Sequence, residues 1–435
     1  MQRWQTVVLL AAAFAVRLAY GLASDLFGHD EVQIFLIGLQ YYTTGAWPFY
    51  GPDVVYTHTQ LPGGLQGLLV AGPLFLVAQP EAAYVLVNVI SLAALSFLAW
   101  YIGRRLPQVP RWFLWPWVLF SPWTLNYSTH IINTSYVLPS GVLFFVGAYE
   151  LVPALRIGAL PRRTAFFCLG AGLLCLLQLH LSSAVLAVLA VIVLGLVARE
   201  RPADLVSGLP WLAAGAAVAG ATLVPALLRD GMAAFKAFGG SNVHPEPAAL
   251  LSLPLLVARF FSFASFEFAR FIGASTEQRL DFLAAYPWAA PFAVVAMLFG
   301  VLQAAWLGIS MFRRQPGEPR WPAVRTATWC LLGLIAAAFT LSVKGPASHV
   351  IYVMLPAVFI YSFYCWAPLL QHRIGKRAAV VLLVSGCVAH AALGVRNFNL
   401  RSLYTNRPLV MRAIVEKNHR LVGERRPDVW RLEAR

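Results

Sequence analysis

The sequence predicts an all-α polytopic membrane protein. Of its 435 residues, 59% are hydrophobic and only 12% are charged, which is about half the charged fraction of a soluble globular domain. Apolar runs close to the roughly 20 residues that cross a bilayer as a helix recur along almost the whole chain. These observations exclude a soluble domain, a disordered protein and a fibrous one.

The net charge of +15, from 33 Lys and Arg against 18 Asp and Glu, has a topological explanation. In a soluble protein it would suggest a nucleic-acid partner. Here the basic residues lie in short loops between apolar runs, which is how membrane proteins mark their cytoplasmic side. We therefore expect no nucleic-acid partner. The five cysteines all fall inside apolar runs without Cys-x-x-Cys spacing, so we expect neither disulfides nor a zinc site.

Charge counting orients about eleven predicted spans. The first apolar run lacks a small-residue cleavage site and is predicted to be a retained span with a cytoplasmic N-terminus. Five arginine-rich loops then share the cytoplasmic side, whereas residues 24–80, on the outer side, hold four acids and no Lys or Arg. The predicted spans are 4–24, 81–103, 112–125, 136–155, 164–180, 183–198, 208–228, 286–312, 324–343, 349–368 and 378–395.

Two further apolar runs are predicted not to span. A twelfth span at 61–78 would invert every later loop, so this run is predicted to be an interfacial or re-entrant helix that begins at Pro62. Residues 250–271 carry three charges, each costing roughly 2.5–3.5 kcal/mol in a lipid-exposed span. They are predicted to form an amphipathic segment on the outer face. Two features fit this scheme less well: span 112–125 is short, and the basic tail falls on the outer side.

The chain divides into one membrane domain, residues 1–395, and a basic polar tail, residues 396–435. We find no repeat of fixed period and no inverted half-repeat in the sequence. A transporter or flippase would be expected to show such repeats and to place ionisable residues near the bilayer midplane. Here the polar residues gather in the outer loops, which favours chemistry at the membrane surface. The transporter or flippase remains an alternative.

The first outer loop opens with adjacent acids, in Gly28-His29-Asp30-Glu31. Acids suit the positive N-terminus of a surface helix, but a carboxylate at the water–lipid boundary can also act as general base for a hydroxyl. An aromatic stretch at 41–53 and the segment Gln60-Leu61-Pro62-Gly63-Gly64 follow. A first loop this long, acidic and aromatic is uncommon in a simple channel or carrier, which favours the functional interpretation.

In this order, the features of the first loop resemble the GT-C superfamily of membrane glycosyltransferases. The superfamily includes the protein O-mannosyltransferases and the aminoarabinose transferases of lipid A. Residues 344–352, with Pro356 following, resemble the family's late outer loop, in which a basic residue and a His-x-x-Tyr precede a span. The hairpin at 178–183 has a counterpart in several branches. The resemblance covers the topology of about 390 residues, and its motifs are brief.

The resemblance implies transfer of a sugar from a polyprenyl-phosphate donor to an acceptor hydroxyl on the outer face of a bacterial plasma membrane. The acceptor would be a lipid, a glycan or a protein. Asp30 would deprotonate the hydroxyl, and Glu31 would assist or orient. Cations would stabilise the departing lipid phosphate in a low-dielectric setting. The candidates are Lys344, His349, His58, Arg17 and Arg270.

Four of the five donor-phosphate candidates have a structural alternative. Lys344 could be a snorkelling lysine at a span end, His349 a helix cap, Arg17 the partner of an acid elsewhere, and Arg270 an anchor to anionic headgroups. Some GT-C branches use a divalent cation, and His29, Asp30, Glu31 and His58 offer ligands. No spacing among them is diagnostic, so we assign no metal. Besides an enzyme and a transporter, a third functional interpretation of the chain is a non-catalytic GT-C-like assembly subunit.

Overall fold

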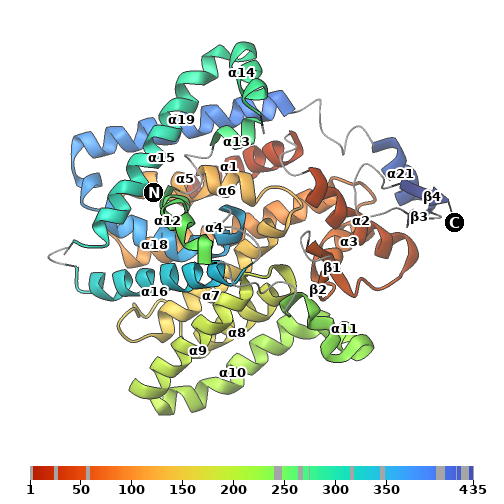
Figure 1. The fold of residues 1–435 in the computed structure, drawn as a ribbon, viewed down its shortest axis with the longest axis horizontal. Coiled ribbons are helices and arrows are strands. Elements are labelled where there is room, and N and C mark those ends of the chain that lie inside the picture. Colours follow the sequence, from red (N-terminus) through yellow and green to blue (C-terminus); the bar gives the residue numbers. More distant parts are fainter. Residues whose placement is uncertain are drawn as a thin grey trace.

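The computed structural model describes residues 3–23, 28–54, 59–239, 247–262, 268–273, 275–313, 318–342, 348–397, 407–417, 419–422 and 431–434. Helices dominate these residues, and the strands form two small two-stranded sheets (Figure 1). Eight of the described helices are long and apolar enough to cross a membrane. The predicted all-α polytopic membrane fold is therefore confirmed.

The helices follow the predicted spans closely. The span predicted at 112–125 is divided at Ser121 and Pro122 into two short helices, α5 and α6. The spans predicted at 208–228 and 349–368 each contain a 3-10 turn. The elements at the predicted spans are α1 (Arg3–Ala23), α4 (Ala82–Arg105), α5 (Arg111–Phe120), α6 (Pro122–Tyr127), α7 (Asn133–Leu151), α8 (Arg162–Leu179), α9 (Ser183–Glu200), α10 (Pro202–Gly220), α15 (Ala290–Ser310), α16 (Trp321–Thr340), α18 (Leu355–Trp366) and α19 (Arg373–Asn397).

Close packing of α7 against α8 fixes the centre of the bundle. Added Cβ atoms at Gly147 of α7 and Gly172 of α8 would lie 2.7 Å from the carbonyl oxygens of Ala165 and Ser140. Such small residues let membrane helices approach until backbone touches backbone. As a result, the start of α7 and the end of α8 are held together at one end of the bundle.

Hydrogen bonds gather the five arginine-rich loops at one end, which we call the arginine-rich end. The loops were predicted to share one side from charge alone, and the structure brings them together as predicted. The bonds run from Arg105 to the Leu155 carbonyl, from Gln108 to Glu318, from Gln371 to the Gln108 carbonyl, from Arg320 to the Arg156 carbonyl and from Arg162 to Asp204. Which side of the membrane this end faces stays a prediction.

The opposite end, which we call the first-loop end, carries α2 (Gly28–Thr44), an antiparallel hairpin of β1 (Tyr50–Val54) and β2 (Thr59–Pro62), and α3 (Leu65–Leu76). With 12 residues, α3 is about 18 Å long and too short to span. This confirms that the run is no twelfth span. Its predicted start at Pro62 is wrong, because Pro62 pairs with Tyr50 in the hairpin and the helix begins at Leu65.

The segment predicted to lie on the outer face at 250–271 instead enters the bundle in part. Gln303, beyond the middle of α15, donates to the Phe261 carbonyl at 2.6 Å, and the Phe261 ring lies 5.5 Å from that of Tyr361 in α18. The described pieces are η4 (Pro247–Ser252), α12 (Leu253–Ser262) and α13 (Phe268–Ile272). The reason is the apolar face formed by Leu256, Phe260 and Phe261, which is buried against neighbouring helices.

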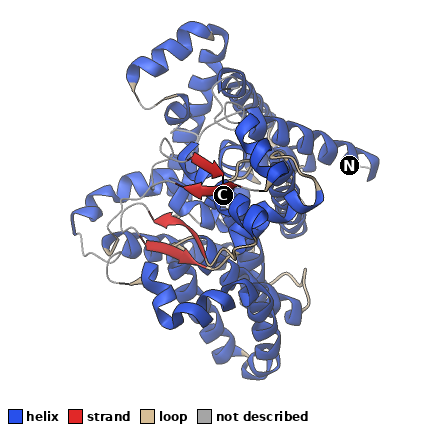
Figure 2. Cartoon of the chain, turned by 90° about the vertical axis from the view of Figure 1, so that its right-hand side faces the viewer, coloured by secondary structure: helices blue, strands red, loops and turns tan. Residues whose placement is uncertain are grey.

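The tail lies at the first-loop end, as predicted. Arg407 at the start of α21 (Arg407–Glu416) pairs with Glu81 at 2.8 Å, and Lys417 lies 4.5 Å from the centre of the Tyr42 ring. Strands β3 (His419–Val422) and β4 (Arg431–Ala434) form the second small sheet. Figure 2, turned so that this side faces the viewer, shows both sheets there. The division into domains at residue 395 stays a prediction.

Short helices complete the described chain. They are η1 (Ala221–Leu223), α11 (Val224–Asp230), η2 (Gly231–Phe238), α14 (Thr276–Ala285), η6 (Pro287–Ala289), α17 (Ser348–Ile351), η7 (Tyr352–Met354) and η8 (Leu369–Gln371).

Candidate functional site

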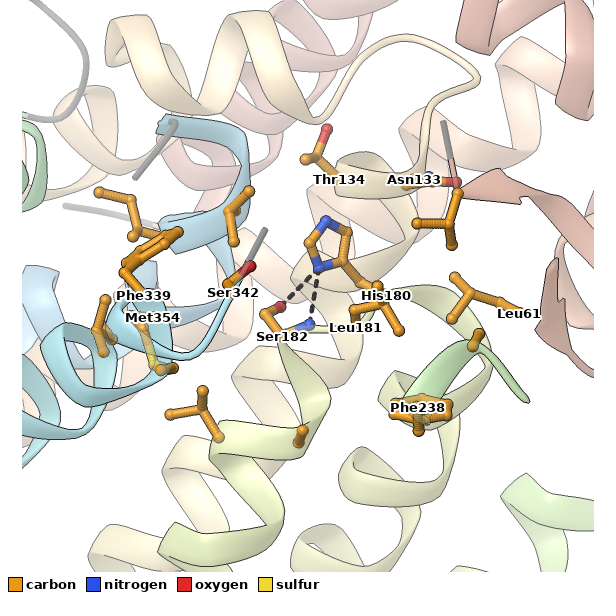
Figure 3. Close-up of a pocket in the computed structure, with 18 of the residues that line it drawn as sticks. Leu61, Asn133, Thr134, His180, Leu181, Ser182, Phe238, Phe339, Ser342 and Met354 are labelled. Atoms are coloured by element: carbon orange, nitrogen blue, oxygen red, sulfur yellow. Dashed lines mark hydrogen bonds between the residues drawn. The ribbon is translucent and has the colours of Figure 1, made fainter. Parts of the chain in front are cut away.

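A cavity of about 620 Å³ lies at the first-loop end of the bundle (Figure 3). Its volume is within the range of small-molecule binding sites. Elements distant in sequence meet around it: the start of α2, the β1–β2 hairpin, the start of α7, the turn between α8 and α9, the end of η2, α16 and α17.

The wall of the cavity has a polar part and an apolar part. The apolar part comes mainly from one face each of α9 and α16, since the lining residues recur at helical spacing. Val188 of α9 is 49% exposed, so the apolar wall continues onto the outer surface of a membrane-spanning helix. The apolar residues include Ala184, Val185, Val188, Leu334, Ile335 and Ala338, and the polar ones are Asp30, Asp53, Tyr127, Asn133, Thr134, His180, Ser182 and Ser342.

Asp30 and Glu31 take different positions although they are neighbours in the first turn of α2. Successive side chains of a helix diverge by about 100°. Asp30 is exposed and lines the cavity. Glu31 is only 3% exposed, and its Oε1 accepts a hydrogen bond from the backbone N–H of Ile131 at 3.2 Å. Of these two neighbours, Asp30 is thus the acid that lines the cavity, while Glu31 ties α2 to the chain just before α7.

Arg17 lies at the break between α5 and α6. Its guanidinium donates to the Leu119 carbonyl at 2.7 Å and to the carbonyl and hydroxyl of Ser128 at 3.1 and 2.6 Å. The carbonyls at the end of a helix lack partners within it, and a cation there is favourable. Arg17 is fully buried and is not among the residues that line the cavity. It stabilises the broken span, and these contacts lend no support to the phosphate role predicted for it.

The other predicted phosphate contacts fall outside what the structure describes. His58 and Lys344 lie outside the described residues, as do the side chains of His349 and Arg270. Three of these four are close in sequence to the cavity wall. Lys344 follows the lining residue Ser342 by two residues in the sequence. His58 belongs to the stretch between the lining residues Val54 and Leu61, and His349 directly precedes the lining residue Val350.

His180 lines the cavity, although no role of its own was predicted for it from the sequence. Its Nδ1 receives the backbone N–H of Ser182 at 3.1 Å and lies 2.7 Å from the Ser182 hydroxyl (Figure 3). A backbone N–H can only donate, so Nδ1 is the acceptor and the proton of the neutral ring is on Nε2. The sequence feature that could have identified His180 as a site residue is its place in the short hairpin between two spans.

The turn that carries His180 is tied to the β1–β2 hairpin through Gln178. The Gln178 side chain donates to the Ala219 carbonyl at 2.8 Å and accepts from the Thr222 hydroxyl at 2.6 Å. The Thr222 carbonyl in turn accepts from the N–H of Gly64 at 3.2 Å. Gly63 has φ +105°, and a Cβ there would lie 2.3 Å from the Gln178 amide oxygen. Only glycine therefore fits at this closure of the cavity wall.

A second tie holds η2, whose Ala237 and Phe238 line the cavity. The Tyr50 hydroxyl donates to the Asp230 carboxylate at 2.5 Å, and the Arg229 guanidinium lies 4.2 Å from the centre of the Phe49 ring. Burial, together with the hydrogen bond to Asp230, raises the pKa of the Tyr50 hydroxyl and keeps it a donor.

Within the described residues, no group of three or more His, Cys, Asp or Glu side chains comes together to hold a metal ion. We assign no cofactor.

Comparison with known proteins gives one structural likeness. No family model matches the sequence, and no curated protein matches it. Among solved structures, the crystal structure of ArnT from Cupriavidus metallidurans bound to undecaprenyl phosphate is similar to this chain. The TM-score is 0.48 and the identity 16%, over 94% of this chain and 80% of that one. The likeness concerns the arrangement of helices alone.

Proposed function

We propose that the protein is a membrane glycosyltransferase that moves a sugar from a polyprenyl-phosphate donor to an acceptor hydroxyl. The observation that carries the proposal is the position of Asp30: an exposed carboxylate lines a cavity that also has an apolar wall, and this wall continues onto the surface of a spanning helix. A donor with a charged sugar-phosphate head and an isoprenoid chain matches this division of polar and apolar wall.

In the proposed reaction, Asp30 accepts the proton of the acceptor hydroxyl as its oxygen attacks the anomeric carbon. The bond between that carbon and the phosphate oxygen breaks, and the polyprenyl phosphate leaves with the bonding electrons. One carboxylate suffices as general base, because the attack needs no covalent enzyme intermediate. Glu31, held by the Ile131 N–H, would act as a positioning residue that fixes the first turn of α2.

The departing phosphate gains negative charge, which a nearby cation would stabilise. Lys344 is the leading candidate, because it follows the lining residue Ser342 so closely in the chain. His58 and His349 are further candidates by the same argument. We leave out Arg17, whose two terminal nitrogens donate to carbonyls and to the Ser128 hydroxyl. Arg270 remains a phosphate-binding candidate only because of the sequence resemblance.

The side on which the reaction occurs follows from the charge rule. If the arginine-rich end is cytoplasmic, the cavity at the first-loop end opens to the outer face. The acceptor would accordingly be a lipid, glycan or protein on that face.

The test is sugar transfer by the full-length protein in proteoliposomes. The donors are a panel of hexoses and pentoses linked to undecaprenyl phosphate, cell-envelope extract supplies acceptors, and the readout is released undecaprenyl phosphate. Removal of a general base lowers rates by about 10²–10⁴, and we expect this loss for Asp30→Asn. The matched control is Asp281→Asn, an exposed acid of α14 that does not line the cavity.

A full rate in Asp30→Asn would remove Asp30 from the catalytic role. Movement of the lipid-linked sugar across the bilayer by the wild type, without release of undecaprenyl phosphate, would favour the transporter alternative.

A further inference from the structure

We infer that His180 binds the phosphate of the lipid donor as a neutral hydrogen-bond donor through its Nε2–H. The inference rests on the proposed function for the class of donor, and it adds a phosphate-binding residue that is not a cation. It follows from three features of His180: its place on the cavity wall, its fixed tautomer and the rigidity of the turn that carries it.

The first feature is the position of the ring. His180 is partly buried and lines the same cavity as Asp30 and Ser342. Figure 3 shows the ring near Thr134, with one nitrogen directed at Ser182 and the second pointing away from it. Because this second nitrogen is Nε2, the donor of the ring is on the side away from Ser182.

The second feature is the tautomer. The backbone N–H of Ser182 donates to Nδ1 at 3.1 Å, and this bond cannot be reversed because an amide N–H has no acceptor capacity. The Ser182 hydroxyl, at 2.7 Å, can donate to the same atom. Nδ1 thus serves as acceptor and Nε2 carries the proton, so the ring presents an N–H to an anionic ligand without carrying charge itself.

The third feature is the rigidity of the support. The His180 N–H bonds to the Leu176 carbonyl at 3.0 Å and the Ser183 N–H bonds to the His180 carbonyl at 3.1 Å, so that the turn continues from α8 directly into α9. Gln178 fixes the end of α8 to Thr222 and Ala219. A ring held in this way loses little freedom when it binds, which favours affinity.

A hydrogen bond from a neutral N–H to a phosphate oxygen is charge-assisted and stronger than a bond between neutral groups. It discriminates between a lipid phosphate and the corresponding lipid alcohol, because only the phosphate bears the charge. That discrimination separates phosphate binding from a purely structural role of His180.

The experiment measures binding of undecaprenyl phosphate and of undecaprenol to the full-length protein in detergent micelles. For His180→Phe, which keeps a planar ring and removes the donor, we expect affinity for undecaprenyl phosphate to fall about tenfold or more, since hydrogen bonds to charged groups have this strength. Affinity for undecaprenol should not change. His180→Gln, with an N–H at similar reach, should recover most of the affinity. His372→Phe, an exposed histidine at the arginine-rich end, is the matched control.

The possible outcomes separate the two proposals. If the wild type binds both lipids equally, the donor class in the proposed function is wrong. If the wild type prefers the phosphate and His180→Phe keeps that preference, the inference about His180 is overturned while the proposed function stands. Equal weakening of both lipids by His180→Phe would show a structural role and would also overturn the inference.

Discussion

Replacement of Arg17 by methionine tests whether this arginine supports the fold or binds donor. Methionine keeps the length and flexibility of the side chain and removes every donor. The variant loses four hydrogen bonds between 2.6 and 3.4 Å, which link α1 to Leu119 at the end of α5, to Thr124 in α6 and to Ser128 after α6. We expect lower stability with the donor site unchanged.

The magnitude follows from the number of bonds. Hydrogen bonds between membrane helices contribute about 0.6 kcal/mol on average and about 1.7 at most, so four of them amount to roughly 2–7 kcal/mol. The cost of placing arginine in a span, roughly 2.5–3.5 kcal/mol, does not offset this loss. This insertion cost is present in the separated, inserted helices as well as in the folded bundle, so it largely cancels from the free energy of unfolding.

The assay is unfolding of the purified protein in mixed detergent–SDS micelles, with undecaprenyl phosphate binding measured on the folded fraction. Arg111→Met, an exposed arginine at the start of α5, is the control and should keep wild-type stability. Arg17→Lys should be intermediate, because lysine lacks the fork that reaches two acceptors at once. Wild-type stability of Arg17→Met combined with lost lipid binding would refute the structural role and restore the phosphate role.

Two further predictions concern the first-loop end. Glu31→Ala should destabilise the protein by about 1–3 kcal/mol, since it leaves the buried Ile131 N–H without the Glu31 acceptor. Glu31→Gln keeps an oxygen in place and should destabilise much less in the same unfolding assay. Equal losses of stability in the two variants would contradict this explanation. Single cysteines at Ala46, exposed in the first loop, and Arg111, exposed at the arginine-rich end, should react with a membrane-impermeant maleimide from opposite sides of intact cells and inverted vesicles. Labelling of both from one side would invalidate the span count.

The helical membrane fold and the grouping of its loops could be predicted from the sequence alone. Hydrophobicity over about 20 residues is a local property, and so is the charge of a short loop. The start of α3 was misplaced because a proline suits both a helix start and a strand end. The pairing of Pro62 with Tyr50, which decides between them, joins residues across a hairpin.

The candidate site could be predicted only in part. The acid pair at 30 and 31 was visible as residues just past the first span. Which of the two faces a cavity depends on how α2 is rotated, and that rotation is fixed by the contact of Glu31 with Ile131, a hundred residues away. His180 had no distinguishing neighbour in the sequence, because its partners on the cavity wall come from α2, α7 and α16.

By itself, the sequence determined that this chain folds as a bundle of membrane helices with five arginine-rich loops at one end, because partition between lipid and water acts on each segment separately. The tertiary structure alone decided that Arg17 bridges a broken helix, that α12 enters the bundle, and that Asp30 shares a cavity with His180. These outcomes depend on which segments become neighbours, and hydrogen bonds and packing between distant residues select those neighbours only when the whole bundle has assembled.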